Sequence, residues 1–421
     1  MTSNWKKCKI GDLCTTISDT YKGDDEKVVL INTSDVLEGK ILNHELIDNK
    51  NLKGQFKKTF QKNDILYSEI RPANKRFAFV DIEYTANYIA STKLMVIRPY
   101  TDLVLPQYLY MILKSQPIID ELQHLAETRS GTFPQITFSA ELAPIDIKIP
   151  PLETQQKIAK VLSAIDDKIE LNNSINNNLE QQAQAIFKSW FVDFEPFGGT
   201  MPKIWKNGTI EDLSQNIICG KTPSTSKKEY YGNDIPFITI PDMHNNTYVT
   251  KTERYLSRLG ASSQKNKILP PNSICVSCIA TAGLVSITAF YSQTNQQINS
   301  IIPAQEMSSY YIYLLLKSLS KKIIMLGSSG STTCNLNKGQ FAKIEVIIPD
   351  KNVLKKHDEI VSPLFESIKN NQLENEQLAQ LRDTLLPKLM NGEIDVSKVD
   401  IDDILTNQSA DKLLFSEGGH E

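Results

Sequence analysis

Two stretches of this 421-residue chain carry the same long pattern of apolar residues, about two hundred positions apart. Between Pro150 and Phe197, apolar residues recur at alternating intervals of four and three, and the same spacing returns between His357 and Leu389. This period is that of a helix packed against another helix. About forty residues at ~1.5 Å each predict a helix of roughly 60 Å. The fold must therefore accommodate two helices much longer than those of an ordinary globular domain.

Each pattern also carries two asparagines at positions where apolar residues are expected. A polar residue in such a seam costs stability and fixes the register of the paired helices. Antiparallel pairing would place Asn172 near Asn375 and Asn176 near Asn371, and we predict this arrangement. The alternative is that these asparagines are merely tolerated on two separate amphipathic helices. The residues predicted to pair the helices are Ile165, Ile169, Asn172, Asn176, Leu179, Leu364, Ile368, Asn371, Asn375 and Leu378.

The segments that precede the two helices resemble each other as well. WKKCKIGDL at 5–13 matches WKNGTIEDL at 205–213, YLYMILKS at 108–115 matches YIYLLLKS at 311–318, and residues 131–150 align without a gap to 330–349. An internal repeat of this kind indicates a duplicated unit. We therefore predict a first globular domain at 1–150, a central helix at 151–199, a second globular domain at 200–349, a distal helix at 350–395 and an acidic tail at 396–421.

Within the globular domains, the periodicity of the sequence is mixed. Alternating or β-branched runs predict strands at 28–31, 64–67, 94–97, 235–240, 274–279 and 284–290, and helical spacing predicts helices at 106–125 and 308–326. Pro363 lies inside the second long pattern and predicts a kink or a separate short first piece. The expected fold class is α+β, with two pseudo-repeated mixed α/β domains separated by two long antiparallel coiled-coil helices.

Several classes of function lack support in the sequence. No apolar run reaches the roughly 18 residues of a membrane span and no signal peptide is visible, so we expect a cytoplasmic protein with no membrane partner. The six cysteines and five histidines show no metal-ligand spacing, and Gly220-Lys221-Thr222 lacks the first glycine of a phosphate-binding loop. No catalytic residues, metal or cofactor are therefore predicted. Two alternatives stay open: an enzyme with an unfamiliar site, and a non-catalytic protein-binding scaffold with a coiled-coil spacer.

The distribution of charge favours a nucleic-acid partner more than the net charge does. The whole chain has a net charge of −3, yet residues 200–349 contain 15 basic and 8 acidic side chains, while residues 350–421 contain 8 basic and 15 acidic ones. A local basic face attracts phosphates even when the whole molecule is slightly acidic.

Several longer blocks carry a resemblance to a known family. PPLETQQKIAKVLSAIDDKI, LEQQAQAIFKSWFVDFEP, QLRDTLLPKLMNGEIDV and GKTPSTSKKEYYGNDIPFITIPDM closely resemble the specificity subunit of type I restriction-modification systems. The resemblance extends to about residue 396 and includes the duplicated plan. It implies two target recognition domains that each read one half of a split, asymmetric site in double-stranded DNA, with the long helices as spacer. GKTPSTSKKEYYGNDIPF has no close equivalent in the first half, where ISDTYKGDDEKVVLI stands instead, so the two half-sites should differ.

The resemblance also implies partners that this chain does not contain. These are two methylation subunits that dock on the helices and use S-adenosylmethionine, and restriction subunits driven by ATP; the assembly is expected to require Mg as well. In that family the specificity subunit has no active site or cofactor of its own.

Polar loop residues are the candidates for DNA contact, because Arg and Lys bind phosphates, Arg binds guanine, and Asn or Gln binds adenine. We select Arg71, Lys75, Arg76, Arg129, Ser130 and Gln135 in the first domain, and Lys221, Thr222, Ser224, Lys227, Lys228, Ser329, Ser331 and Thr332 in the second. Any of them can instead be an ordinary solvated loop residue. Phe187, Trp190, Phe191 and Phe194 are candidates for docking a methylation subunit, and packing against this chain's own second domain is the alternative.

Overall fold

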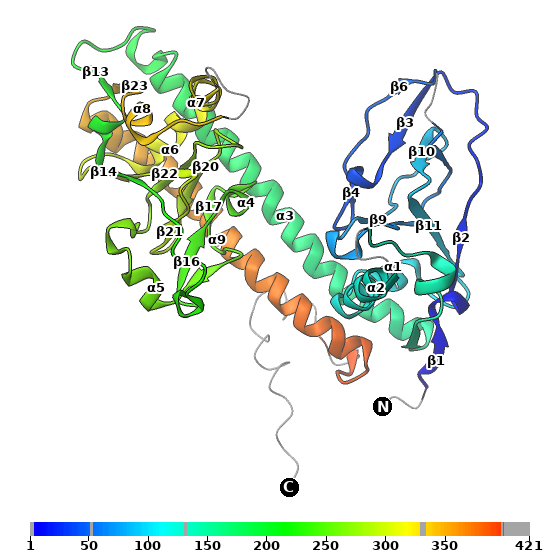
Figure 1. The fold of residues 1–421 in the computed structure, drawn as a ribbon. Helices are drawn as coiled ribbons and strands as arrows, with labels where there is room; N and C mark the ends of the chain where they lie inside the picture. Colours follow the sequence, from blue (N-terminus) through cyan, green and yellow to red (C-terminus); the bar gives the residue numbers. More distant parts are fainter. Residues whose placement is uncertain (1–3, 51–53, 130–132, 329–333, 397–398, 400–421) are drawn as a thin grey trace. The chain divides into compact units, whose positions relative to one another are not determined.

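The computed structural model describes residues 4–50, 54–129, 133–328, 334–396 and 399. The chain forms two compact units: unit 1 comprises Met1–Asp167 and Ala379–Glu421, and unit 2 comprises Lys168–Leu378. Two long helices, α3 (Leu152–Phe191) and α9 (Lys351–Met390), are each divided between the units (Figure 1). Each unit therefore consists of one globular part and a portion of both helices.

The described residues of the globular part of unit 1 form two four-stranded sheets and two two-stranded ribbons, one of which pairs β4 with β5. One sheet is antiparallel with the order β2-β11-β8-β9, the other has the order β6-β3-β10-β7, and β1 pairs with β12. The strands are β1 (Lys6–Lys9), β2 (Cys14–Ile17), β3 (Lys27–Ile31), β4 (Val36–Leu37), β5 (Lys40–Ile41), β6 (Ile47–Asp48), β7 (Phe56–Lys58), β8 (Ile65–Ser68), β9 (Phe77–Phe79), β10 (Tyr88–Ser91), β11 (Leu94–Pro99) and β12 (Asp146–Ile149). The helices are α1 (Pro106–Leu113) and α2 (Gln116–Arg129).

The globular part of unit 2 is built on the same plan. Its sheets have the orders β14-β22-β19-β20-β17 and β15-β18-β16-β21, and β13 pairs with β23. The strands are β13 (Lys206–Thr209), β14 (Ser214–Cys219), β15 (Tyr231–Gly232), β16 (Ile235–Ile238), β17 (Tyr248–Val249), β18 (Tyr255–Leu256), β19 (Ile274–Ser277), β20 (Val285–Thr288), β21 (Gln293–Thr294), β22 (Ile298–Pro303) and β23 (Glu345–Ile348). The helices are α4 (Ile240–Met243), α5 (Arg258–Ser262), α6 (Ser309–Ser318), α7 (Ser320–Gly327) and α8 (Lys338–Ala342).

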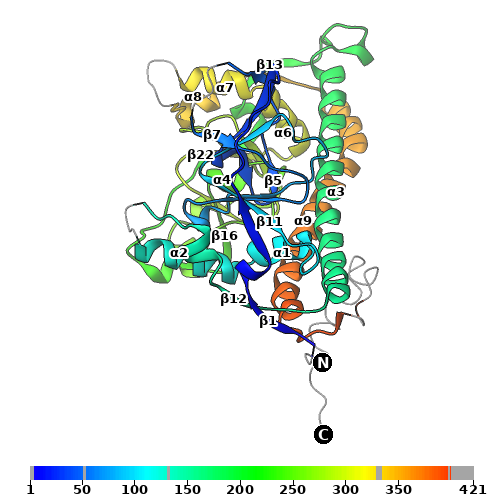
Figure 2. The same cartoon turned by 90° about the vertical axis from the view of Figure 1, so that its right-hand side faces the viewer.

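The strand orders show that the sequence repeat is a structural repeat. The order β2-β11-β8-β9 in unit 1 corresponds to β14-β22-β19-β20 in unit 2, and the parallel pair β3-β10 corresponds to the parallel pair β16-β21. The ribbon β1-β12, seen near the start of the chain in Figure 2, corresponds to β13-β23. The predicted fold class of two pseudo-repeated mixed domains with two long helices is therefore confirmed.

Some predicted boundaries are wrong for identifiable local reasons. The helix expected at 106–125 is two helices, because Pro117 in the first turn of α2 has no amide hydrogen to donate to the carbonyl of Leu113, where α1 ends. The helix expected at 308–326 is likewise divided into α6 and α7; the Ser318 hydroxyl at the division donates to the Leu315 carbonyl (2.7 Å). The strand expected at 235–240 ends at Ile238, since α4 begins at Ile240.

Residues 131–150 and 330–349 are not equivalent without a gap, contrary to the sequence alignment. The backbone amides of Ile136 and Leu336, which are 200 positions apart, donate to the residue that follows β8 and β19 respectively (2.9 Å in both). The strands β12 and β23, which come next, begin 199 positions apart. Unit 1 therefore has one extra residue between these points.

A π-helix absorbs this extra residue. Unit 1 has the π-helix Phe138–Leu142 where unit 2 has the ordinary helix α8, and the wider turn is closed by the bond from Ala143 N to Phe138 O (2.7 Å). A single inserted residue is accommodated in this way because a π-turn spans one residue more than an α-turn. The capping residues Thr137 and Asn337 keep the same role in both units.

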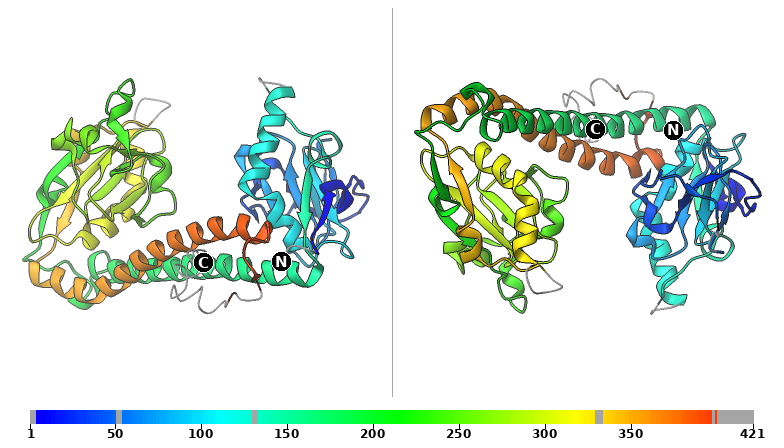
Figure 3. Two further views of the ribbon diagram at one scale, coloured as in Figure 1. Left: turned by 90° about the horizontal axis from the view of Figure 1, so that it is seen from below. Right: turned by 90° about the horizontal axis from the view of Figure 1, so that it is seen from above.

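The two long helices each contain 40 residues, as the apolar period predicts. Figure 3 shows α3 and α9 lying side by side. Helix α9 runs without a break through Pro363, so the separate first piece expected there is absent. It ends at Met390, shortly before Gly392, which adopts the left-handed conformation (φ 71°).

Amide side chains pair the helices inside unit 2. Asn172 Nδ2 donates to Asn375 Oδ1 (2.9 Å) and to Glu374 Oε2 (2.7 Å), and Asn371 Nδ2 donates to Asn176 Oδ1 (2.8 Å). Asn172 is buried, so these bonds replace its lost contact with water. From Asn172 to Asn176 the residue number rises along α3, while that of the partner falls from Asn375 to Asn371 along α9. This confirms the antiparallel pairing that the repeat predicts.

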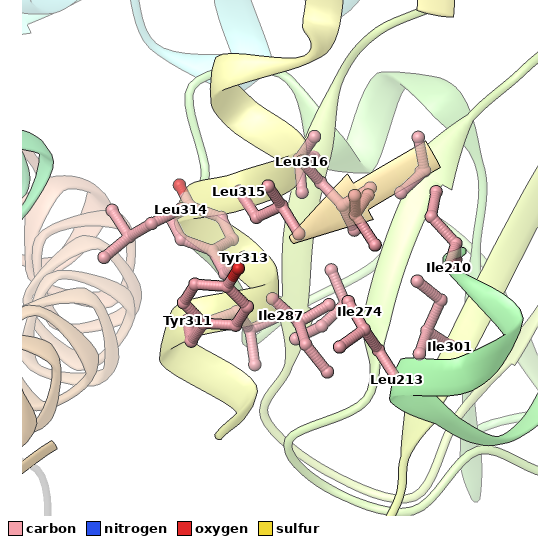
Figure 4. Close-up of a cluster of buried hydrophobic side chains, with 14 of the residues drawn as sticks. Ile210, Leu213, Ile274, Ile287, Ile301, Tyr311, Tyr313, Leu314, Leu315 and Leu316 are labelled. Atoms are coloured by element: carbon pink, nitrogen blue, oxygen red, sulfur yellow. The ribbon is translucent and has the colours of Figure 1, made fainter. Parts of the chain in front are cut away.

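The main core of unit 2 lies between α6 and the five-stranded sheet. Figure 4 shows Tyr311, Tyr313 and Leu315 of α6 near Ile274 and Ile287 of the sheet. In unit 1, one core cluster lies between the two sheets, where β3, β8, β10 and β11 bury aliphatic side chains, and α1 buries further apolar residues such as Leu109 and Ile112. Large apolar groups removed from water in this way supply most of the stability, and they leave the polar loops free for other roles.

Candidate nucleic-acid interface

The loop that follows β8 in unit 1 carries three of the predicted cationic residues, and Arg71 among them is exposed. Arg71 and Lys75 flank the 3-10 helix Pro72–Asn74, and both adopt the left-handed conformation (φ 45° and 53°). Non-glycine residues rarely adopt this conformation, and those that do are found preferentially at functional sites. The backbone amide of Arg71 donates to the Pro134 carbonyl (3.2 Å), and its side chain is exposed. The strained loop therefore holds the Arg71 guanidinium in solvent.

Other predicted cations of unit 1 have partners inside the unit. Arg76 Nη1 donates to the carbonyls of Ser34 (3.0 Å) and Val36 (3.4 Å), which fixes the adjoining loop. Arg129 Nη1 lies 3.1 Å from Glu141 Oε1. The Lys75 ammonium lies 4.0 Å from Glu38 Oε1, at the limit of an ion pair. Of these, Arg76 and Arg129 are better explained as structural, and Ser130 lies outside the described residues.

The Glu141 carboxylate has a second structural role. Its Oε2 accepts hydrogen bonds from the backbone amide (2.6 Å) and the hydroxyl (2.9 Å) of Thr137, while its Oε1 faces Arg129. Glu141 therefore ties the end of α2 to the π-helix that carries the inserted residue. The ion pair with Arg129 belongs to this local scaffold.

Gln135 belongs to a charged cluster that the sequence did not reveal. Lys93 Nζ lies 3.5 Å from Gln135 Oε1 and 3.8 Å from Glu69 Oε2, and Lys58 Nζ lies 3.9 Å from Glu69 Oε1. Burial lowers the pKa of Lys58 and the nearby positive charge of Lys93 adds to this effect, whereas Glu69 opposes it. Lys58 ends β7, Glu69 follows β8 and Lys93 lies between β10 and β11, so no local sequence signal could have grouped them.

In unit 2, the loop after β14 carries Lys221 and Thr222. Thr222 Oγ1 donates to Gln296 Oε1 (2.8 Å), which lies between β21 and β22. Lys221 N donates to the Thr294 carbonyl (2.9 Å), while the Lys221 side chain is exposed. Two segments about seventy residues apart in sequence thus form one polar surface. Gln296 is a member that sequence analysis missed.

The remaining predicted residues of unit 2 occupy the next turn of the chain. Ser224 Oγ and Ser226 Oγ are 2.8 Å apart. Lys227 Nζ donates to the Tyr230 hydroxyl (3.1 Å) and lies 4.9 Å from the centre of that ring. Lys228 begins the 3-10 helix Lys228–Tyr230. These side chains are exposed; Ser329, Ser331 and Thr332 lie outside the described residues.

The aromatic residues at the end of α3 are mainly internal to unit 2. Phe187 and Phe191 are each 4% exposed, and Phe191 packs on Tyr311 and His357, with ring centres 4.8 and 5.0 Å apart. This geometry favours the alternative of packing against the second domain. The same two rings, with the partly exposed Phe194, also line one wall of a cleft of about 770 Å³ between α3, α6 and the β13-β23 ribbon.

Equivalent lysines connect the globular parts to α3. In unit 1, Lys114 Nζ lies 2.9 Å from Asp166, which also accepts from Arg382 of α9 (2.8 Å). In unit 2, Lys317 Nζ lies 2.9 Å from Glu180. Burial alone would raise the pKa of both carboxyl groups, but the neighbouring cations outweigh it, and both pKa values are lowered. Both carboxylates therefore stay ionised at neutral pH.

The described residues include no group of three or more His, Cys, Asp or Glu side chains that could hold a metal ion. None of the helices in this part of the chain is both long enough and apolar enough to span a membrane.

Comparison with known proteins decides the family. The model of the type I restriction modification DNA specificity domain matches the chain twice, at residues 2–181 and 202–382. The chain belongs to this family. It is a specificity subunit with two specificity domains, and such subunits are the non-catalytic part of type I restriction enzymes. The resemblance noted in the sequence is thus confirmed.

Individual relatives cover most of the chain. The type I restriction enzyme HindI specificity subunit of Haemophilus influenzae is 44% identical over 93% of this chain and 100% of that protein. The MjaIX specificity subunit of Methanocaldococcus jannaschii is 30% identical over 71% of each chain. Among solved structures, the S subunit of a type I restriction-modification system from M. genitalium has a TM-score of 0.55 at 18% identity, covering 92% of this chain and 96% of that one, and it supports the fold.

Proposed function

We propose that each unit of this specificity subunit reads one half of a bipartite, asymmetric target in double-stranded DNA. The observation that carries the proposal is the repeated fold with different residues at the equivalent loop. Arg71 and Ala280 occupy the same position after β8 and β19, and both adopt a left-handed backbone (φ 45° and 62°). The backbone of the loop is thus repeated while the side chain that it presents differs. Two such surfaces would select two different half-sites.

We propose that the paired helices set the distance between the half-sites. Forty residues at ~1.5 Å give each helix a length of about 60 Å. The Asn172–Asn375 and Asn176–Asn371 pairs fix the register of the helices within unit 2, and the Asp166–Arg382 pair joins them within unit 1. A spacer with a fixed register is what a reader of two separated half-sites requires.

Two methylation subunits are the proposed protein partners. The cleft formed in unit 2 by α6, the β13-β23 ribbon and the end of α3 has a smaller counterpart of about 330 Å³ in unit 1, near α1, β12 and the end of α9. Two equivalent clefts suit two copies of one partner. The methylation subunits would supply S-adenosylmethionine chemistry, and restriction subunits with ATP and Mg would complete a cytoplasmic assembly.

A selection experiment tests the proposal. The full chain, with and without its methylation subunits, is mixed with a library of randomised duplexes, and the bound duplexes are sequenced at several salt concentrations. The expected result is two short, unlike sequence elements separated by a fixed gap, with affinity falling as salt rises. Binding of the partner subunits without any selected sequence would instead favour the protein-binding scaffold.

A further inference from the structure

A polar platform in unit 2 brings together three segments that are distant in sequence. They are residues 219–222 at the end of β14, residues 264–267 after α5 and residues 293–297 at β21. Figure 1 shows α5, β16 and β21 at the same end of unit 2. The approach of the first and third segments requires Gly220, because a Cβ there would lie only 2.1 Å from the Asn295 carbonyl oxygen.

Buried amides hold the platform together. Gln293 is fully buried, and its Nε2 donates to the Ala261 carbonyl (2.9 Å). Gln264, which is 8% exposed, donates both to Gln293 Oε1 (2.7 Å) and to the Lys221 carbonyl (2.8 Å). Each of these bonds satisfies a group that would otherwise be costly to bury. The network therefore fixes the position of the loop that carries Lys221.

Three lysines surround this network. Lys221 and Lys265 are exposed, and Lys267 Nζ donates to the Cys219 carbonyl (2.8 Å). In the described part of the chain, no carboxylate lies within ion-pair distance of any of them. A cluster of cations whose charges no carboxylate neutralises, carried on rigid backbone, is suited to phosphate groups.

Gln296 differs from its neighbours in facing solvent. Thr294 and Asn295 are buried, and Asn295 bonds with Gln297 (3.0 Å), whereas the Gln296 side chain is exposed. Thr222 Oγ1 donates to Gln296 Oε1 (2.8 Å), which orients the amide. An amide oxygen has two lone pairs and the amide nitrogen two hydrogens, so both atoms keep capacity for a further partner.

We propose that Gln296 is a base-reading residue of unit 2, with Lys221, Lys265 and Lys267 as its phosphate contacts. An oriented glutamine amide pairs with adenine in the major groove: its Nε2 donates to N7 and its Oε1 accepts from the N6 amino group. Thr222 acts as a positioning residue, because its hydroxyl already restricts the Gln296 side chain before DNA binds. Less conformational entropy is then lost on binding. This inference rests on the proposed DNA function and adds to it one residue and one base.

The test is the same duplex selection, applied to the complete complex with single variants. Gln296→Ala is expected to lower discrimination at one base pair of one half-site by about 5- to 150-fold, with the other half-site unchanged. Gln296→Glu is expected to lose the preference for adenine at that same base pair, because a carboxylate accepts hydrogen bonds but cannot donate one to N7. Lys265→Ala is expected to weaken binding equally for all sequences and to reduce the salt dependence by about one phosphate contact.

A matched control and a second readout separate the outcomes. Gln215 is an exposed glutamine at the other end of β14, and Gln215→Ala should leave both half-sites unchanged. An unaltered consensus with Gln296→Ala would overturn the inference, and so would equal loss at both half-sites together with a lowered Tm. If the unaltered complex selects no sequence at all, the proposed function itself fails, which distinguishes the two failures.

Discussion

Lengthening both long helices by one heptad should change the target in a calculable way. The structure divides α3 between Asp167 and Lys168 and α9 between Leu378 and Ala379, and these two points lie opposite each other in the antiparallel register. We therefore insert a copy of residues 161–167 after Asp167, and a copy of residues 379–385 before Ala379. The insertions duplicate both Asp166 and Arg382, so the added turns bring their own ion pair.

The expected change follows from helix geometry. Seven residues at ~1.5 Å lengthen the pair by about 10 Å, which at ~3.4 Å per base pair corresponds to about three base pairs. Three base pairs also rotate the second half-site by about 100°, given about 10.5 base pairs per turn. We expect the preferred gap to increase by about three base pairs, with an affinity lower than that of the unaltered chain for its own target.

The assay is a competition among duplexes that share both half-sites and differ only in the gap, from the original length to five base pairs more. Insertion into α3 alone is the control, because the asparagine pairs and the Asp166–Arg382 pair can then no longer form in one register, which should lower stability without defining a new gap. If the doubly lengthened chain still prefers the original gap, the helices do not set the spacing.

Four further outcomes can be checked on purified variants. Asn172→Ala should lower the free energy of unfolding by about 1–3 kcal/mol, because it removes the two hydrogen bonds to Glu374 and Asn375 at ~0.5–1.5 kcal/mol each; denaturant titration measures this. Asp166→Asn should cost about 2 kcal/mol at pH 7. Since the folded pKa of Asp166 is lowered, its contribution is present above the unfolded value of about 3.8 and lost as pH falls below it, so the variant should lose less stability on acidification than the unaltered chain does. Phe191→Ala should destabilise by about 3–5 kcal/mol, whereas Val192→Ala, at a residue that is 51% exposed, should spare stability and weaken binding of the methylation subunit in a pull-down. Replacing residues 1–150 by the domain of another specificity subunit should alter one half-site in the selection; alteration of both would contradict modular reading.

The sequence predicted the helices and much of the repeat because those features depend on local periodicity. The paired asparagines show this best, since spacing alone placed Asn172 opposite Asn375. The candidate interface depends instead on contacts between distant segments. Arg76 and Arg129 were selected as loop cations, but partners across the fold engage both side chains. Gln296 lies in a run of six polar residues, 292–297, and only the tertiary structure shows that it alone among residues 294–296 is exposed beside Thr222.

The division of α9 between the units has a consequence for the order in which the chain matures during synthesis. Gln372 of α9 bonds to both backbone groups of Tyr248 at the edge of the sheet in unit 2, and Arg382 pairs with Asp166 in unit 1. Neither contact can form until the ribosome has added the last part of the chain. At 5–20 residues per second, the roughly two hundred residues between Asp166 and Gln372 take about 10–40 s. Throughout that interval the apolar stripe of α3 has no partner helix, so the nascent chain presents a surface that a chaperone can hold.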